Sequence, residues 1–93
     1  MDFAAPTPNP APRSTRFTWA VPGDRAGNPL EVAVFDLSGR RVRVIEKGLA
    51  QPGRHGATWD LRNDHGARVE GGVYFVRYML GREIRSQKLV VLQ

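Results

Sequence analysis

Apolar side chains alternate with polar or small ones along most of this chain, and no segment of ten residues shows helical spacing. Phe17, Trp19 and Val21 follow this pattern in the first clear example. A period of two places such residues on one side of a β-strand. The same alternation recurs in segments 30–35, 42–45, 55–59, 73–80 and 83–92. Turn residues separate these segments about every ten positions, so the pattern predicts an antiparallel β-sandwich of six or seven short strands.

The stretch Asp36–Gly39 is predicted to reverse the chain. An Asp carboxylate accepts nearby backbone N–H groups in such turns, and Gly tolerates a positive φ. After the turn, valines and arginines alternate. We expect the valines to face the core and the arginines to face solvent, because a slip of one residue would bury charge. The two sets are Val42 with Val44, and Arg41 with Arg43.

The last two strands should form a hairpin around Gly81-Arg82, where Gly supplies the unusual backbone dihedral. Ile84 and Leu89 in the final segment have opposite parity. An apolar face can accommodate both only if the strand gains an extra residue. We therefore predict a β-bulge near Ser86 or Gln87.

Aromatic residues divide into two groups by parity. One group falls on the expected core faces, where a small domain needs bulky side chains, and it comprises Phe17, Trp19, Trp59, Tyr74 and Tyr78. Tyr74 could also donate its hydroxyl to the backbone, as in a tyrosine corner. Phe35 and Phe75 have the other parity. Aromatic side chains on an exposed strand face often contact a partner, so these two are candidate contact residues.

Composition limits the domain organisation. A chain of 93 residues suits one domain, and the absence of cysteine excludes disulfides and thiolate chemistry. Residues 1–13 are rich in proline and are expected to form a linker or entry segment, with the folded domain in residues 14–93. We find no signal peptide at the start, so targeting information is expected elsewhere in a larger parent chain.

The net charge is +5, and arginine supplies most of it. Arg40, Arg41 and Arg43 lie within four positions. Such a cluster is compatible with nucleic-acid binding, which we keep as the alternative function. The aromatic residues that stack on bases are missing around these arginines. A solvated strand face is therefore the preferred interpretation, and a nucleic-acid partner is not expected.

Candidate chemistry is sparse. Asp60, Asn63 and Asp64 offer oxygen ligands of the kind that calcium prefers, although their spacing differs from an EF-hand loop and turns use the same residues. His55 and His65 lack thiol partners for zinc. No serine lies in a nucleophile elbow, and no glycine-rich loop precedes a helix. We expect no catalytic residues, no cofactor and no metal, and an enzyme or a carbohydrate-binding module has least support.

Four tracts together resemble a known family. They are "PNP" at 8–10, "VAVFDLSGRRVRVI" at 32–45, "GRHGATWDLRNDHGARVEGGVYFVRY" at 53–78 and "QKLVVLQ" at 87–93. The chain is similar to the immunoglobulin-like domain at the C-termini of many secreted bacterial proteins. That family includes the type IX secretion sorting domain and the Ig-like domain of the flagellar hook-capping protein. The Trp-Asp, the Gly turn and the Gly-Val-Tyr between Trp59 and Tyr78 favour the hook-cap-like branch.

The resemblance implies a non-catalytic Ig-like sandwich of about seven antiparallel strands. Sorting domains are read by secretion machinery or used in surface attachment, and hook-cap domains are structural parts of an assembly scaffold. The implied setting is extracellular or at the cell surface, with protein partners and no membrane insertion. The fold-signature positions are Asn9, Pro10, Asp36, Gly39, Trp59, Asp60, Gly72, Tyr74 and the last strand from Lys88 to Leu92. The candidate partner-binding residues are Phe35, Phe75, Arg41, Arg43 and Lys88.

Overall fold

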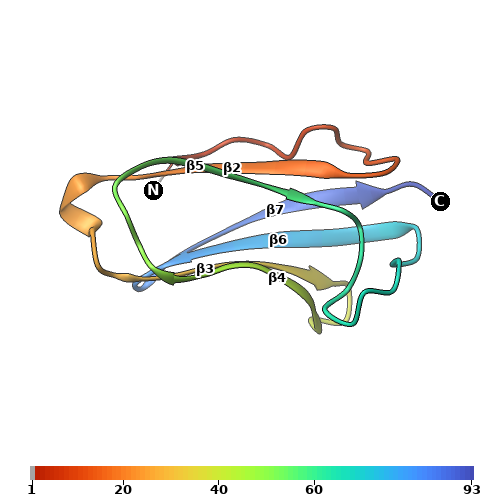
Figure 1. Cartoon of the computed structure of the whole chain (residues 1–93). Coiled ribbons are helices and arrows are strands. Elements are labelled where there is room, and N and C mark those ends of the chain that lie inside the picture. The colour runs from red at the N-terminus through yellow and green to blue at the C-terminus, as the bar shows by residue number, and fades with distance from the viewer. Residues whose placement is uncertain (1) are drawn as a thin grey trace.

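Two antiparallel sheets pack face to face in the computed structural model, which describes residues 2–93 (Figure 1). The three-stranded sheet has the order β1 (Asp2–Phe3), β2 (Thr15–Val21), β5 (Gly53–Trp59). The four-stranded sheet has the order β4 (Arg41–Leu49), β3 (Pro29–Asp36), β6 (Gly72–Leu80), β7 (Glu83–Val91). A short 3-10 turn, η1 (Gly23–Arg25), precedes β3. The predicted all-β sandwich of about seven strands is confirmed, and no helix within residues 2–93 has the length and apolarity to cross a membrane.

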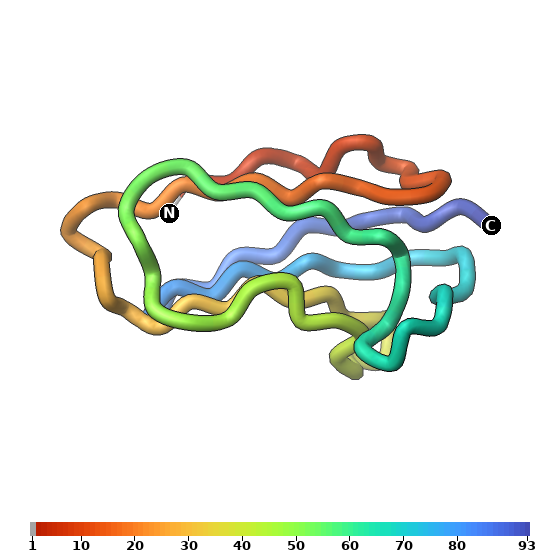
Figure 2. Tube along the Cα trace, in the orientation of Figure 1, coloured from red at the N-terminus to blue at the C-terminus, as the bar shows by residue number. Residues whose placement is uncertain are grey.

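The chain crosses from one sheet to the other three times, and its path can be followed in the tube of Figure 2. It crosses after β2, after β4 and after β5, and the last crossing uses the long loop 60–71. The two hairpins β3–β4 and β6–β7 lie within the four-stranded sheet, where β3 and β6 are its central strands. Gly81 and Arg82 make the predicted tight turn, with Gly81 at a φ of 58°.

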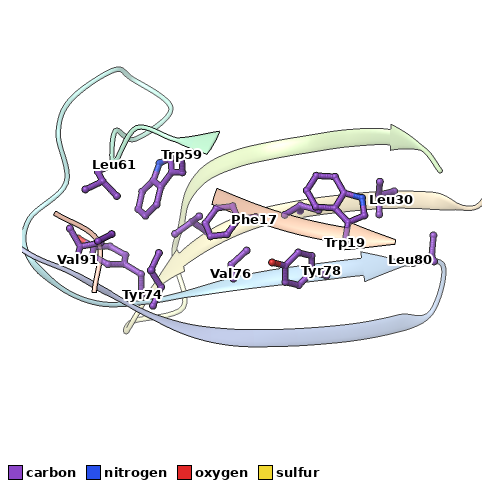
Figure 3. Close-up of a cluster of buried hydrophobic side chains, with 14 of the residues drawn as sticks. Phe17, Trp19, Leu30, Trp59, Leu61, Tyr74, Val76, Tyr78, Leu80 and Val91 are labelled. Carbon is purple, nitrogen blue, oxygen red and sulfur yellow. The ribbon is translucent and has the colours of Figure 1, made fainter. Parts of the chain in front are cut away.

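The core is a layer of aromatic and aliphatic side chains from both sheets, which point toward one another in Figure 3. All five predicted core aromatics are buried, namely Phe17, Trp19, Trp59, Tyr74 and Tyr78. Phe17 stacks on Trp59 with ring centroids 6.5 Å apart, and Trp59 meets Tyr74 edge to face at 5.9 Å. These geometries are the favourable ones for aromatic pairs. Burial also raises the pKa of Tyr78 to about 12.

The predicted bulge in the last strand is wrong. β6 and β7 pair in one continuous register, with Met79 opposite Ile84 and Tyr74 opposite Leu89. Leu89 is fully buried and Ile84 is 53% exposed on the outer face. The opposing sheet has only three strands, and it leaves the first half of β7 uncovered, where the Arg85 side chain is 51% exposed at core parity. We infer that exposing the Ile84 side chain on this part of β7 costs less free energy than breaking the regular pairing of β7 with β6 would.

The irregularities lie instead between β3 and β4. The register shifts between Val32 and Ala33 and again between Val34 and Phe35. Val42 and Ile45 consequently pack against the core, whereas Val44 lies opposite Ala33 on the outer side. Arg43 lies opposite the inward-facing Val34. The expected alternation thus holds for Val42 and Arg41 and is wrong for Val44 and Arg43, because each shift changes the parity of the residues that follow.

The proline-rich segment follows the edges of both sheets. β1 pairs with β2, and Ala11 makes an isolated parallel bridge to Val91. The Asn9 side chain donates from Nδ2 to the Lys88 carbonyl at 3.2 Å and accepts the Val90 N–H at 3.0 Å. Asn9 thereby satisfies backbone groups that an edge strand would otherwise leave open.

Replacement of a core aromatic should destabilise the sandwich strongly. Phe17→Ala removes a fully buried ring that stacks on Trp59, so we expect the free energy of unfolding to fall by about 3–5 kcal/mol in urea denaturation. The control is Ile84→Ala, which truncates an exposed residue and should cost less than about 0.5 kcal/mol. Similar losses in the two variants would contradict the assignment of core and surface.

Candidate functional site: the outer face of the four-stranded sheet

One cross-strand row brings together four of the five candidate contact residues. Each strand of the four-stranded sheet contributes one residue, and the row runs Arg41, Phe35, Phe75, Lys88. Directly paired residues have Cβ atoms about 5 Å apart, so the side chains are neighbours. Two phenyl rings therefore lie at the centre of the outer face with a positive charge at each end. We call these four residues the outer-face row.

Arg77 completes the centre of this surface. Its guanidinium carbon lies 4.2 Å from the centroid of the Phe35 ring, a cation–π geometry. The Nε atom is buried and makes no hydrogen bond with any residue in the range 2–93. Stacking on Phe35, rather than hydrogen bonding, thus holds the guanidinium in place. A shallow hollow of about 320 Å³ lies beside it, and its lining includes Leu37, Phe75 and Ser86.

The charge on this surface is mostly positive. Arg41, Arg77 and Lys88 form no ion pair with the described carboxylates. Glu31, which shares the outer face, lies directly opposite Lys47, a residue of opposite charge. The three cations around the phenyl rings are therefore available to carboxylates of another molecule.

The β3–β4 turn forms one end of the face and depends on Asp36. Its Oδ1 accepts the Ser38 hydroxyl at 2.6 Å, the Ser38 N–H at 2.9 Å and the Arg40 N–H at 3.1 Å. These contacts, with the Ser38 hydroxyl foremost, lower the pKa of Asp36 below its ordinary value. Gly39 takes a φ of 85°, as predicted for this turn, and Leu37 at the tip is 71% exposed. Three hydrogen bonds to one carboxylate oxygen thus hold the turn, which presents an apolar side chain.

Arg43 lies away from the outer-face row, at the edge of β4 that meets the loop 60–71. Its Nη1 donates to Asp60 Oδ1 at 3.3 Å and to the Arg62 carbonyl at 3.1 Å, and its Nε lies 4.0 Å from Asp64 Oδ1. Arg40 likewise pairs with Asp36 at 3.6 Å. Two of the three clustered arginines therefore have carboxylate partners within the chain, which weakens the case for a phosphate-binding cluster.

The three candidate calcium ligands accept hydrogen bonds from backbone N–H groups of the loop and of β4. Asp60 Oδ1 accepts the Arg62 N–H, and Asp64 Oδ1 accepts the Val44 N–H at 3.1 Å. Asn63 Oδ1 accepts the backbone N–H groups of residues 65 and 67. Among residues 2–93, no group of three or more His, Cys, Asp or Glu side chains is placed to hold a metal. Backbone hydrogen bonds thus occupy one oxygen atom of each of these three side chains.

Two fold-signature aromatics fasten the long loop to the core. The Tyr74 hydroxyl donates to the Glu70 carbonyl at 2.6 Å, which confirms the expected tyrosine corner. Trp59 Nε1 donates to the Arg62 carbonyl at 2.8 Å. Between them, Leu61 adopts a φ of 61° and buries its side chain completely. Burial raises the pKa of Tyr74, consistent with its position beneath the loop.

Sequence reasoning did not single out Arg77 or Leu37 as contact residues. The signal for Arg77 was present, since it shares the parity of Phe75 two positions earlier. Its stacking on Phe35 depends on the pairing of β3 with β6, which alternation along one strand does not specify. Leu37 lies in a turn, where apolar periodicity carries no information.

The strand arrangement and the tyrosine corner define the class of protein, an immunoglobulin-like β-sandwich. A sequence model of the FlgD Ig-like domain matches residues 9–78. The chain belongs to the FlgD Ig-like domain family, which confirms the resemblance inferred from its motifs. No curated protein matches the chain in sequence.

Two solved structures from Porphyromonas gingivalis share the fold. PorZ, an essential bacterial surface component of the type IX secretion system, aligns with a TM-score of 0.63 and 18% identity over 98% of this chain. Dimeric latent PorU aligns with a TM-score of 0.70 and 21% identity over 97% of this chain. The aligned parts are 11% of PorZ and 9% of PorU, so the chain spans about a tenth of each.

The pH dependence of stability should report on Asp36. Its folded pKa is lowered, so its ionised carboxylate stabilises the fold above the unfolded pKa of about 3.9, and this contribution disappears as the pH falls through the folded value. Urea denaturation between pH 7 and pH 2 should therefore show wild type and Asp36→Asn converging in acid. Asp24→Asn makes the same charge change at an exposed position of η1 and serves as the control. A wild-type advantage that stays constant with pH would contradict the role of the ionised carboxylate.

Proposed function

We propose that this chain is a non-catalytic Ig-like accessory module of an exported bacterial protein, and that it docks to proteins of secretion or assembly machinery. The observation that carries the proposal is the outer-face row, together with Arg77 stacked on Phe35. Phe35 and Phe75 lie on the outer face of the sheet and are not part of the hydrophobic core between the two sheets. Aromatic and Arg side chains are the types that supply most of the energy of protein interfaces.

The chemistry of the row specifies a partner with an apolar centre and carboxylates around it. Burial of Phe35 and Phe75 would provide the hydrophobic part of the binding energy. Arg41 and Lys88 would pair with acidic residues at the rim, where complementary charge increases the association rate and favours one orientation. The occupant we propose is therefore an acidic protein surface.

Family membership and the shared fold support the setting of the module. The relatives of known structure are far longer than this chain, so we propose that residues 14–93 act as one domain of a larger protein, with residues 1–13 as its entry segment. PorZ is described as a surface component, and we propose an extracellular or cell-surface position for this chain by analogy. Sorting or surface attachment and a structural role in assembly are the two forms that the docking function could take.

A fusion protein tests the sorting form of the proposal. A reporter placed before this chain should reach the cell surface in a host with a type IX secretion system. Arg41→Glu/Lys88→Glu should reduce the surface reporter about tenfold, because it opposes an acidic partner with like charge. The matched control is Arg13→Glu/Arg82→Glu, which makes the same charge change at exposed positions outside the row.

Two results would overturn the proposal at different points. A reporter whose location is the same with and without the chain would exclude sorting. Equal surface levels for the row variant and the control would exclude docking through the outer-face row. Urea denaturation of both variants, with free energies of unfolding close to wild type, ensures that loss of folding does not explain a reduced signal.

A further inference from the structure

The opposite side of the sandwich carries a second feature, a hollow of about 510 Å³ on the outer face of the three-stranded sheet. Small side chains form its floor, since Ala4, Thr18, Ala20 and Gly56 all line it. Arg16 and Arg54 line it from β2 and β5. Short residues on β2, on β5 and just after β1 thus leave a depression beside two long cationic side chains.

Gly56 gives the Arg16 side chain room to reach the strand that carries Arg54. A Cβ atom at position 56 would lie 2.9 Å from Cζ of Arg16, so the guanidinium rests directly on the glycine backbone. Arg16 pairs with Thr58, and its side chain therefore runs diagonally across the sheet toward β5. Arg54 is two residues from Gly56 and projects from the same face of β5. Any larger residue at position 56 would push the Arg16 guanidinium off this path.

The two guanidinium groups have no anionic partner among residues 2–93. Neither Arg16 nor Arg54 forms an ion pair or a side-chain hydrogen bond with the described residues. Asp2 is the one carboxylate among the residues that line the hollow, and it belongs to β1, on the far side of β2 from β5. Two like charges that share one depression repel each other, and an anion between them would convert this repulsion into attraction.

We infer that this hollow binds a doubly charged oxyanion, a phosphate or sulfate group. Guanidinium groups present forked donors that match the oxygen atoms of such ions, so Arg16 and Arg54 would bind it from two sides. The Thr18 hydroxyl, half-buried in the floor, can donate a further hydrogen bond. This site is separate from the outer-face row, since it lies on the other sheet.

Titration with inorganic phosphate tests the inference directly. Arg Nε–Hε and backbone N–H resonances of β2 and β5 should shift with saturation in NMR spectra at low ionic strength. Arg16→Gln/Arg54→Gln should weaken phosphate binding about tenfold, because it removes both charged donors. Arg41→Gln/Lys88→Gln removes the same charge from the outer-face row and should leave the affinity unchanged. An equal loss in the two variants would overturn the site in favour of general attraction by net charge.

Two further measurements sharpen the result. Gly56→Ala keeps every charge but displaces the Arg16 guanidinium, so its affinity for phosphate should fall below that of wild type. The Arg41→Gln/Lys88→Gln variant, which loses two charges elsewhere, should keep the wild-type affinity for phosphate. Sulfate should bind comparably to phosphate and acetate more weakly; acetate of equal affinity would overturn the assignment to a doubly charged ion. Failure of phosphate to bind would leave the reporter fusion unaffected, so the two proposals fail separately.

Discussion

The parity of β6 is the constraint on which both the core and the proposed docking surface depend. Tyr74 and Tyr78 turn inward, where they meet Trp59 and Trp19 from the other sheet. A slip of one residue would place Arg77 in the core without a partner and would expose both tyrosines. Because the aromatic contacts exclude that alternative, every odd-numbered residue of β6 from Phe75 to Met79 faces outward. The composition of the outer face therefore follows from the packing of the inner one.

Side chains at the sheet edges limit how the module can associate. Asn9 covers the second half of β7 with two hydrogen bonds, and Asp64 accepts an N–H group at the edge of β4. Edge strands that are satisfied in this way offer fewer backbone groups to another chain. The flat faces are left as the larger contact surfaces, and the two faces differ. One carries aromatic rings between cations, and the other carries the hollow lined by Arg16 and Arg54.

Most of the strands could be predicted from alternation, because burial on one side of a sheet enforces a period of two. The prediction was wrong where a neighbouring strand changes the rule. β4 shifts register twice against β3, which turned Val44 outward and Arg43 toward the loop. β7 stays regular because the three-stranded sheet leaves the exposed Ile84 end uncovered on its inner side. The residues of a strand do not specify whether the opposite sheet covers it or in which register it pairs with its neighbour.

The sequence by itself determined the core aromatic residues, where most of the turns lie and that Phe35 and Phe75 face away from the core, since these depend on local parity and turn chemistry. Only the tertiary structure decided which outward residues become neighbours. The outer-face row takes one residue from each of four strands, and the Arg16 guanidinium reaches the strand of Arg54 because Gly56 leaves room for it. Such surfaces arise from register between strands distant in the chain, and register is a property of the packed sheets.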